Sequence, residues 1–398
     1  MAPTGRGLRW PAVRIAVVSW EYPPLVVGGI SAHADGLARA IVRAGHEVVV
    51  MTLHHPDAPD DGVVDGVRVL RARPELPWLP DDHFVAHMAS ANHHLVALAA
   101  RLGSWRPDLV HAHDWLVAWA GATLHATWQV PLVATVHATE RGRSGGHIGP
   151  GQPTAINSVE WWLTYEAARV ICCSEFMRGE VIDAFQLPRD KIDVVPNGVD
   201  IDEWTPPASG ERDGGDQPLI VSWGRVQYEK GFQTLVHALP EVRLAAPDAR
   251  AVVAGRGSYL QELHATARAL GVDDICDFPG FVPDEELKAL LHRATVAVIP
   301  SLYEPFGIVA LEAMAAGAPV VAAAAGGLIE VIDGTGAGLL YPPGDAGALS
   351  GTLRGVLAHP DAMVAQRASA YALLRHRYTW DAVAALTLPV YEAALRPY

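Results

Sequence analysis

Two glutamates, Glu304 and Glu312, bracket the run EPFGIVALE at residues 304–312. The run follows a short apolar segment and leads into a helical pattern, so it indicates a strand-turn-helix unit. Gly307 removes side-chain bulk where the free amides at the start of a helix can bind an anion. Carboxylates can accept hydrogen bonds from neutral hydroxyl groups. A nucleotide sugar carries a diphosphate between two polyols, and this unit predicts a site for such a ligand.

A second charged run, GRVQYEKG at residues 224–231, directly follows an apolar strand pattern and precedes a helix. Arg225 and Lys230 would therefore project from the carboxyl end of that strand. Two cations there suit a diphosphate whose negative charge grows as a sugar leaves. A solvated charged loop is the alternative on this run alone. Together with residues 304–312, the phosphate interpretation is favoured.

Glycine pairs follow two other strand patterns. Gly28 and Gly29 would let the backbone approach a ligand closely, although a Gly-Gly pair often forms only a turn. Gly255 and Gly257 begin a pattern typical of dinucleotide sites, but the third glycine position of that pattern is Leu260. A nicotinamide site is therefore not expected.

Histidines and a carboxylate end two more strands. His111, His113 and Asp114 end one, and His137 ends the next. Because a second carboxylate or a thiolate is missing from this set, metal ligation is unattractive and we expect no metal. Contacts of these side chains with sugar hydroxyls are the preferred interpretation.

The elements that must position these residues alternate between short apolar strands and amphipathic helices. The alternation occurs twice, which predicts two α/β domains with parallel sheets and a binding cleft between them. We expect a first domain at residues 1–204, a linker rich in proline and glycine at 205–218, and a second domain at 219–379. An exposed strand is expected at 67–70.

Composition excludes several classes of protein. The 398 residues carry a formal net charge of −14, which argues against a nucleic-acid binder and against general adhesion to anionic lipid. The three cysteines form neither a disulfide framework nor a zinc motif, and no apolar run is long enough for a membrane helix. A cytoplasmic monomer or homodimer is expected, without nucleic-acid partners and with no indication of peripheral membrane contact.

Taken together, the motifs resemble those of family 4 retaining glycosyltransferases, which have the GT-B architecture of two Rossmann-like parallel-sheet domains facing a central cleft. The resemblance covers nearly the whole chain and is specific for the superfamily. It rests on WEYPP at 20–24 with GGI at 28–30, HAHDW at 111–115, VHATE at 136–140, PNGVD at 196–200, GFV at 280–282, and the two runs described above.

The resemblance implies catalytic roles for four residues. Arg225 and Lys230 would bind the donor diphosphate, Glu304 would face the donor sugar, and His137 would contact that sugar and the reaction centre. Such enzymes generally need no metal or other cofactor. The departing phosphate is thought to help deprotonate the acceptor hydroxyl on the same face of the sugar.

The remaining roles follow from the same resemblance. Asp114 and Glu140 would lie on the acceptor side, Glu312 would hold the ribose hydroxyls, and the final helix, within residues 380–398, would pack back on the first domain. The other donor-binding positions would be Gly28, Gly29, Phe281, Val282, Phe306, Gly307 and Ile308.

Within the family, residues 19–24, 113–115 and 139–143 are similar to those of actinobacterial α-1,4-glucosyltransferases of the glycogen synthase type. This implies transfer of a hexose, glucose above all, from UDP-glucose or ADP-glucose to a carbohydrate such as an α-1,4-glucan. The loop at residues 25–29 lacks the lysine of bacterial starch-type synthases, which argues against ADP-glucose. Alternatives are glucosyl, mannosyl or N-acetylglucosaminyl transfer to a lipid-linked or small natural-product acceptor, nucleotide-sugar epimerisation, and a non-catalytic sugar-nucleotide sensor.

Overall fold

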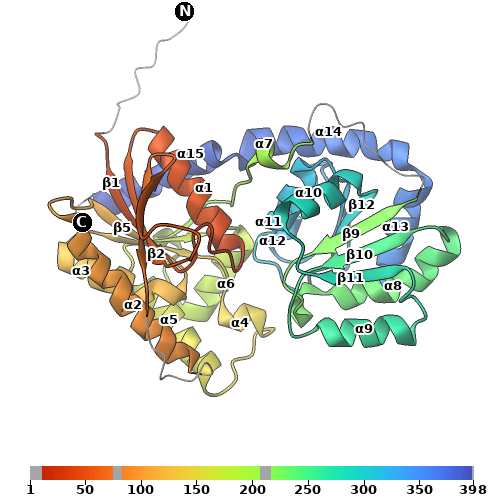
Figure 1. The fold of residues 1–398 in the computed structure, drawn as a ribbon, viewed down its shortest axis with the longest axis horizontal. Helices are drawn as coiled ribbons and strands as arrows, with labels where there is room; N and C mark the ends of the chain where they lie inside the picture. Colours follow the sequence, from red (N-terminus) through yellow and green to blue (C-terminus); the bar gives the residue numbers. More distant parts are fainter. Residues whose placement is uncertain (1–10, 75–82, 207–216, 397–398) are drawn as a thin grey trace, which may run out of the picture.

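The computed structural model describes residues 11–74, 83–206 and 217–396. These residues form two α/β units that lie side by side, coloured red to yellow-green and green to blue in Figure 1. The expected linker at 205–218 lies mostly outside the described residues. The two sheets themselves agree with the architecture expected from the alternation of strands and helices.

The first sheet has the strand order β3-β4-β2-β1-β5-β6-β7-β8 and is parallel except for β3. Helices pack on both of its faces. The strands are β1 (Arg14–Ser19), β2 (Glu47–Leu53), β3 (Asp61–Val64), β4 (Val67–Ala72), β5 (Leu109–His113), β6 (Leu132–Val136), β7 (Arg169–Cys172) and β8 (Ile192–Val194). The helices are α1 (Gly29–Arg43), α2 (Phe84–Ala97), α3 (Ala118–Trp128), α4 (Glu140–Arg143), α5 (Gln152–Glu166), α6 (Glu175–Phe185) and α7 (Ile201–Trp204).

The second sheet has the strand order β11-β10-β9-β12-β13-β14 and its strand pairs are parallel. Its strands are β9 (Leu219–Trp223), β10 (Arg250–Ala254), β11 (Cys276–Gly280), β12 (Val296–Ile299), β13 (Val320–Ala323) and β14 (Leu339–Tyr341). The helices are α8 (Phe232–Ala245), α9 (Leu260–Ala269), α10 (Asp284–Arg293), α11 (Ile308–Ala315), α12 (Gly327–Ile332), α13 (Ala346–Ala358), α14 (Met363–Leu373) and α15 (Trp380–Leu395).

Strand order reverses between β1 and β5 in the first sheet and between β9 and β12 in the second. In open parallel sheets, ligands bind beyond the carboxyl ends of the strands at such reversals. The glycine pair, Asp114, Arg225 and Glu304 all follow one of these four strands. The topology therefore gathers the charged and glycine-rich runs at two reversal points, one in each domain.

The chain returns from the second domain to the first after α14, which lies along the top of Figure 1, and the last helix, α15, packs against the first domain. Trp380, at its start, packs so closely on α1 and residue 198 that a Cβ on Gly36 would lie 2.1 Å from the indole. Tyr391 is buried in the same core cluster as β1 and α1.

One expectation about the first sheet was wrong. The strand at 67–70 is buried as part of β4, because β3 pairs with it in antiparallel register and takes the edge position instead. The three cysteines are free and buried. Among the described residues, the helices lack the combination of length and apolar character that crossing a bilayer requires.

Candidate active site

Lys230 and Glu304 form an ion pair at the ends of two neighbouring strands. Lys230 ends the 3₁₀ turn after β9, and its Nζ lies 2.8 Å from Oε2 of Glu304, which follows β12. The Ser301 hydroxyl donates to the same oxygen at 3.1 Å. Both charged side chains are largely buried. The pair therefore fixes an ammonium group and a carboxylate at one point beside the start of α11.

Glu312 projects from the second turn of α11 and accepts a hydrogen bond from Trp223 Nε1 at 3.3 Å. Burial raises the pKa of its carboxyl to about 7, which the indole donor partly counteracts. The group is thus poised between its two protonation states near neutral pH. Donors such as ribose hydroxyls would favour the charged form.

The start of α11 is where the two domains come into contact near these charges. Gly307 precedes the helix with φ of +107°, and a Cβ there would lie 2.5 Å from Leu328. A Cβ on Gly29 of the first domain would lie 2.9 Å from Ile308 Cδ1. The positive φ of Gly307 favours glycine at that position, and the first-domain glycine loop lies against the helix start that was expected to bind phosphate.

Glu21 holds that glycine loop, a role that sequence reasoning missed. Its carboxylate accepts hydrogen bonds from the backbone amides of Val27 at 2.5 Å and Gly28 at 2.8 Å. Burial raises its pKa, while the two amides and the positive charge of Arg225 oppose this rise. Arg225 is itself exposed and thus available to a ligand. A glutamate directly after an apolar strand and seven residues before a glycine was the available signal.

Three further residues, Phe281, Val282 and Phe306, were expected to contact the donor. Phe281 is exposed, and the Arg256 guanidinium lies 5.6 Å from the centre of its ring. Val282 is half-buried beside it. Phe306 is buried against Tyr378, with ring centres 5.9 Å apart. The structure thus directs the Phe306 side chain into the core, and only its backbone could reach a donor.

On the first-domain side, His137 belongs to a cluster of imidazoles. Its Nε2 lies 3.2 Å from His113 Nδ1, and its ring centre lies 4.8 Å from that of His33, which comes from α1. Burial lowers the pKa of His137 and His113 well below the usual value and that of His33 to about 4. These side chains are therefore neutral near pH 7, and His137 can exchange hydrogen bonds with a sugar without carrying charge.

Further contacts fix the orientation of this cluster. His33 Nδ1 pairs with Asn197 Oδ1 at 2.7 Å, and His111 bridges Tyr391 and Thr135 with two contacts of 2.7 Å. Because Tyr391 lies on α15, the returning helix takes part in orienting the imidazoles. Sequence reasoning missed His33, since its position on α1 gives no sign of which strand ends it faces.

The group of described residues that could hold a metal consists of His33, His113 and His137, whose ligand atoms all lie within 4.8 Å of one another. In a tetrahedral zinc site, with Zn–N of about 2.1 Å, ligand nitrogens lie only about 3.4 Å apart. His113 and His137 already pair with each other, and His33 pairs with Asn197. The Nε2 atoms of His33 and His113 are buried without a protein partner. We interpret the cluster as a support for His137.

A cluster of acids and one arginine surrounds Asp114, beside the histidines. Asp114 has φ of +68°, accepts a hydrogen bond from the Trp115 amide at 3.0 Å, and lies 3.9 Å from Arg143. Arg143 also contacts Glu140 at 3.3 Å. Glu160 accepts the Glu140 amide at 2.8 Å, and burial raises its pKa to about 9, so it is protonated at neutral pH. Burial also raises the pKa of Asp114.

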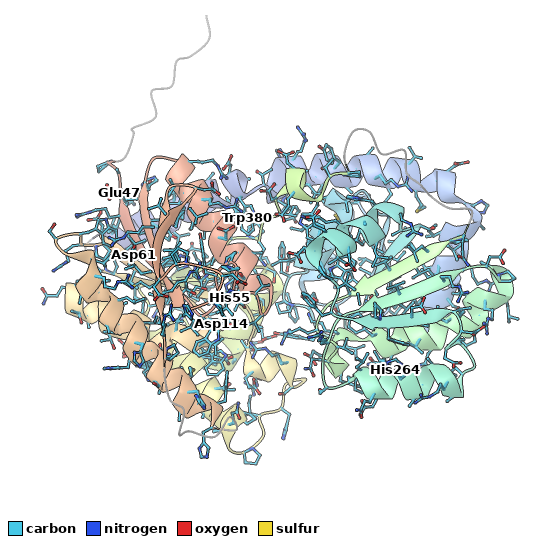
Figure 2. The ribbon with its side chains drawn as sticks, viewed as in Figure 1. Glu47, His55, Asp61, Asp114, His264 and Trp380 are labelled. Carbon is cyan, nitrogen blue, oxygen red and sulfur yellow. The ribbon has the colours of Figure 1, made fainter. Side chains whose placement is uncertain are left out.

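A cavity of about 500 Å³ lies beyond this cluster, where the two domains meet. It is lined by Arg141, by Phe176 and Glu180 of α6, and by Tyr303, which directly precedes Glu304. Tyr303 donates to Glu180 at 3.0 Å across the domain boundary. Figure 2 shows Asp114 on the part of the first domain that faces the second.

The expected site residues thus lie on two facing surfaces. Lys230 and Glu304 lie beside the start of α11, Glu312 projects from this helix, and Arg225 follows β9. His137, Asp114 and Glu140 follow the ends of β5 and β6. The glycine loop of the first domain reaches the second-domain surface at Ile308. Such an arrangement can hold an anion and a polyol at one surface and an uncharged reactant at the other.

Comparison with known proteins identifies the family. Residues 27–203 match the family described as "Glycosyltransferase Family 4", and residues 209–373 match "Glycosyl transferases group 1". The chain is 38% identical to a glycogen synthase of Mycobacterium tuberculosis over 96% of this chain and 95% of that protein. It is 32% identical to an alpha-maltose-1-phosphate synthase of Mycolicibacterium smegmatis over 96% of this chain and 99% of that protein.

Among solved structures, a sucrose-phosphate synthase from Thermosynechococcus elongatus superposes with a TM-score of 0.80 at 23% identity, covering 96% of this chain and 98% of that one. This likeness concerns the fold, which is the GT-B architecture expected from the sequence motifs. The chain belongs to glycosyltransferase family 4 and is a glycosyltransferase.

Proposed function

We propose that the enzyme transfers glucose from UDP-glucose or ADP-glucose to the end of an α-1,4-glucan, with retention of anomeric configuration. The observation that carries this proposal is the ion pair of Lys230 and Glu304 beside the start of α11, with exposed Arg225 nearby. The named function of the mycobacterial glycogen synthase supports glucose and a glucan acceptor. No metal or other cofactor is part of the proposal.

In the proposed reaction, the second domain holds the donor. Arg225, Lys230 and the amides before α11 bind the diphosphate and stabilise its charge as the glucosyl bond breaks. Glu304 orients Lys230 and accepts hydrogen bonds from the sugar, and Glu312 binds the ribose. Neutral His137 contacts the sugar from the opposite domain. The departing phosphate takes the proton of the acceptor hydroxyl that forms the new bond on the same face.

A second acceptor class, a phosphorylated sugar, is favoured by one observation. Arg141 lines the cavity between the domains, is exposed, and forms no salt bridge within the described part of the chain. Its guanidinium could pair with an acceptor phosphate. The alpha-maltose-1-phosphate synthase at 32% identity has a name that indicates a phosphosugar product.

The test combines donors and acceptors in one assay of nucleotide release. UDP-glucose, ADP-glucose and GDP-glucose are each incubated with a malto-oligosaccharide, with glucose 1-phosphate, or with no acceptor. We expect release that depends on the malto-oligosaccharide, with a lengthened product that α-amylase degrades. Release that depends only on glucose 1-phosphate would support the second class. Binding of a nucleotide with no release in any combination would favour a sensor and contradict catalysis.

A further inference from the structure

The start of α6 is hydrogen-bonded directly to the second domain. Ser174 caps this helix by accepting the Met177 amide at 3.0 Å. Its hydroxyl also donates to the backbone carbonyl of Pro305 at 2.6 Å. The residue that begins a first-domain helix is thus bonded to the residue that follows Glu304 in the second domain.

A carboxylate of the second domain completes the start of the same helix. Glu330, on α12, accepts the Glu175 amide at 2.9 Å through Oε2 and the Phe176 amide at 2.7 Å through Oε1. These two amides have no partner within their own helix, and the positive end of the helix dipole favours an anion there. An exposed glutamate of one domain therefore serves as the anionic cap for a helix of the other.

Helix α12 also lies directly on the backbone at the donor site. The Gly327 amide donates to the Glu304 carbonyl at 2.9 Å. A Cβ on Gly326 would lie 2.1 Å from that oxygen, and a Cβ on Gly327 would lie 2.4 Å from the Pro305 carbonyl oxygen. With so little space between them, any displacement of α12 must displace Glu304 or break these contacts.

We propose that Glu330 is a positioning residue for glycosyl transfer. Its bonds to α6 hold the domains closed, and closure holds α12 and the carbonyl of Pro305 in place, which keeps Glu304 on Lys230. The inference rests on the proposed donor role of Glu304. Loss of the Glu330 contact would let the domains separate, admit water to the donor and loosen the Glu304 backbone.

The experiment compares Glu330→Ala and Glu330→Gln with Glu262→Gln, which alters an exposed acid in the first turn of α9. The radius of gyration by X-ray scattering, measured without substrate, reports closure. Donor hydrolysis relative to transfer reports the entry of water. We expect Glu330→Ala to expand the enzyme, to lower kcat/KM about tenfold and to raise the hydrolysis-to-transfer ratio, because one charge-assisted helix-end contact is lost. Glu330→Gln should give values of all three quantities between those of Glu330→Ala and those of the parent enzyme.

The variant pair Ser174→Ala and Glu330→Ala separates positioning from a general loss of stability. If both residues act through closure, the fold-decrease in kcat/KM of the double variant should be smaller than the product of the fold-decreases of the two single variants. An unchanged radius together with an unchanged hydrolysis-to-transfer ratio in Glu330→Ala would overturn the proposal. Expansion of an enzyme that transfers no sugar would instead contradict the proposed function, because scattering requires no donor.

Discussion

The two surfaces of the active site differ in how they treat charge. On the first-domain surface, His137, His113 and His33 are neutral, and each has contacts within the protein. On the second-domain surface, Arg225 is exposed and Lys230 keeps its ammonium group in an ion pair. We infer that the cations of the second domain select the charged part of the donor, whereas the histidines of the first domain offer neutral groups to hydroxyls beside the charged pair of Asp114 and Arg143.

The difference has a physical cause. Burying an ionised group costs free energy, so buried imidazoles lose their charge, while a cation that must meet a diphosphate has to remain charged and accessible. The second domain keeps its cations charged in two ways: Arg225 is exposed, and the largely buried ammonium group of Lys230 is paired with the Glu304 carboxylate. The first domain can bury its histidines because a neutral group suffices for contact with a sugar.

The largest loss of activity is expected from Glu304→Gln, which removes a charge from the second-domain surface. We expect turnover to fall at least about 10³-fold, since the amide that replaces the carboxylate would carry no charge to hold Lys230 and to meet the sugar. Affinity for UDP, which lacks the sugar, should stay nearly unchanged in calorimetric titration. The matched control is Glu286→Gln, an exposed acid on α10. A large loss of UDP affinity would show that Glu304 serves the nucleotide instead.

Removal of the cation should have the next largest effect. Lys230→Ala is expected to weaken nucleotide binding and to lower the rate about 10²- to 10³-fold, because the leaving phosphate loses its closest ammonium group. Steady-state kinetics with and without magnesium would measure this. We expect no rescue by magnesium, whereas Lys230→Arg should retain part of the activity. Undiminished turnover in Lys230→Ala would remove the lysine from the mechanism.

The dependence of stability on pH tests whether the buried histidines of the first domain are neutral. His33 has a pKa of about 4 in the folded protein, against a usual value near 6.5. Between these two pH values the imidazole of the unfolded chain binds a proton that the folded chain does not bind. Stability from this group is complete above pH 6.5 and decreases as the pH falls. At pH 5 the loss should be roughly 2 kcal/mol, or about 2–3 °C in Tm for a chain of 398 residues.

The measurement compares Tm at pH 7.5 and pH 5.0 in the parent and in His33→Asn. The decrease in Tm between pH 7.5 and pH 5.0 should be smaller in His33→Asn than in the parent. The exposed His264 in Figure 2 provides the control substitution His264→Asn, which should leave the drop unchanged. The parent comparison is needed because the raised pKa of Glu160 acts in the opposite direction. An equal drop in His33→Asn would show that His33 titrates normally.

The smallest effect concerns Glu312. With a carboxyl pKa of about 7, most of the group is protonated at pH 6 and most is charged at pH 8. If the carboxylate binds the ribose hydroxyls, the Kd for UDP-glucose should rise up to about tenfold as the pH falls from 8 to 6. Glu312→Gln should abolish this dependence. A flat profile in the parent enzyme would contradict the ribose role.

Strand ends were the predictable part of this site. Short apolar runs followed by glycine or charge identified the ends of β1, β9 and β12, because parallel strands in a buried sheet have a strong local signature. The strand at 67–70 was wrongly expected to be exposed, because short-range pattern does not reveal that β3 adds to the sheet edge.

Contacts between residues far apart in the chain could not be predicted from the sequence. His33 lies on a helical pattern that is apolar enough to be ordinary core, and its partner Asn197 is 164 positions away. Glu330 belongs to no motif found in the sequence and is exposed, but its two carboxylate oxygens accept hydrogen bonds from amides of the other domain. Such contacts depend on how two independently formed sheets face each other, which local propensity does not encode.

The returning helix α15 has a mechanical consequence. The segment that leads out of the first domain contacts the segment that leads back to it, because the Val199 amide donates to the Tyr378 carbonyl at 2.8 Å. The two crossings are therefore tied together at one point on the rim. Opening of the domains about this point would leave the hydrogen bond intact, whereas any motion that carries Val199 away from Tyr378 would break it.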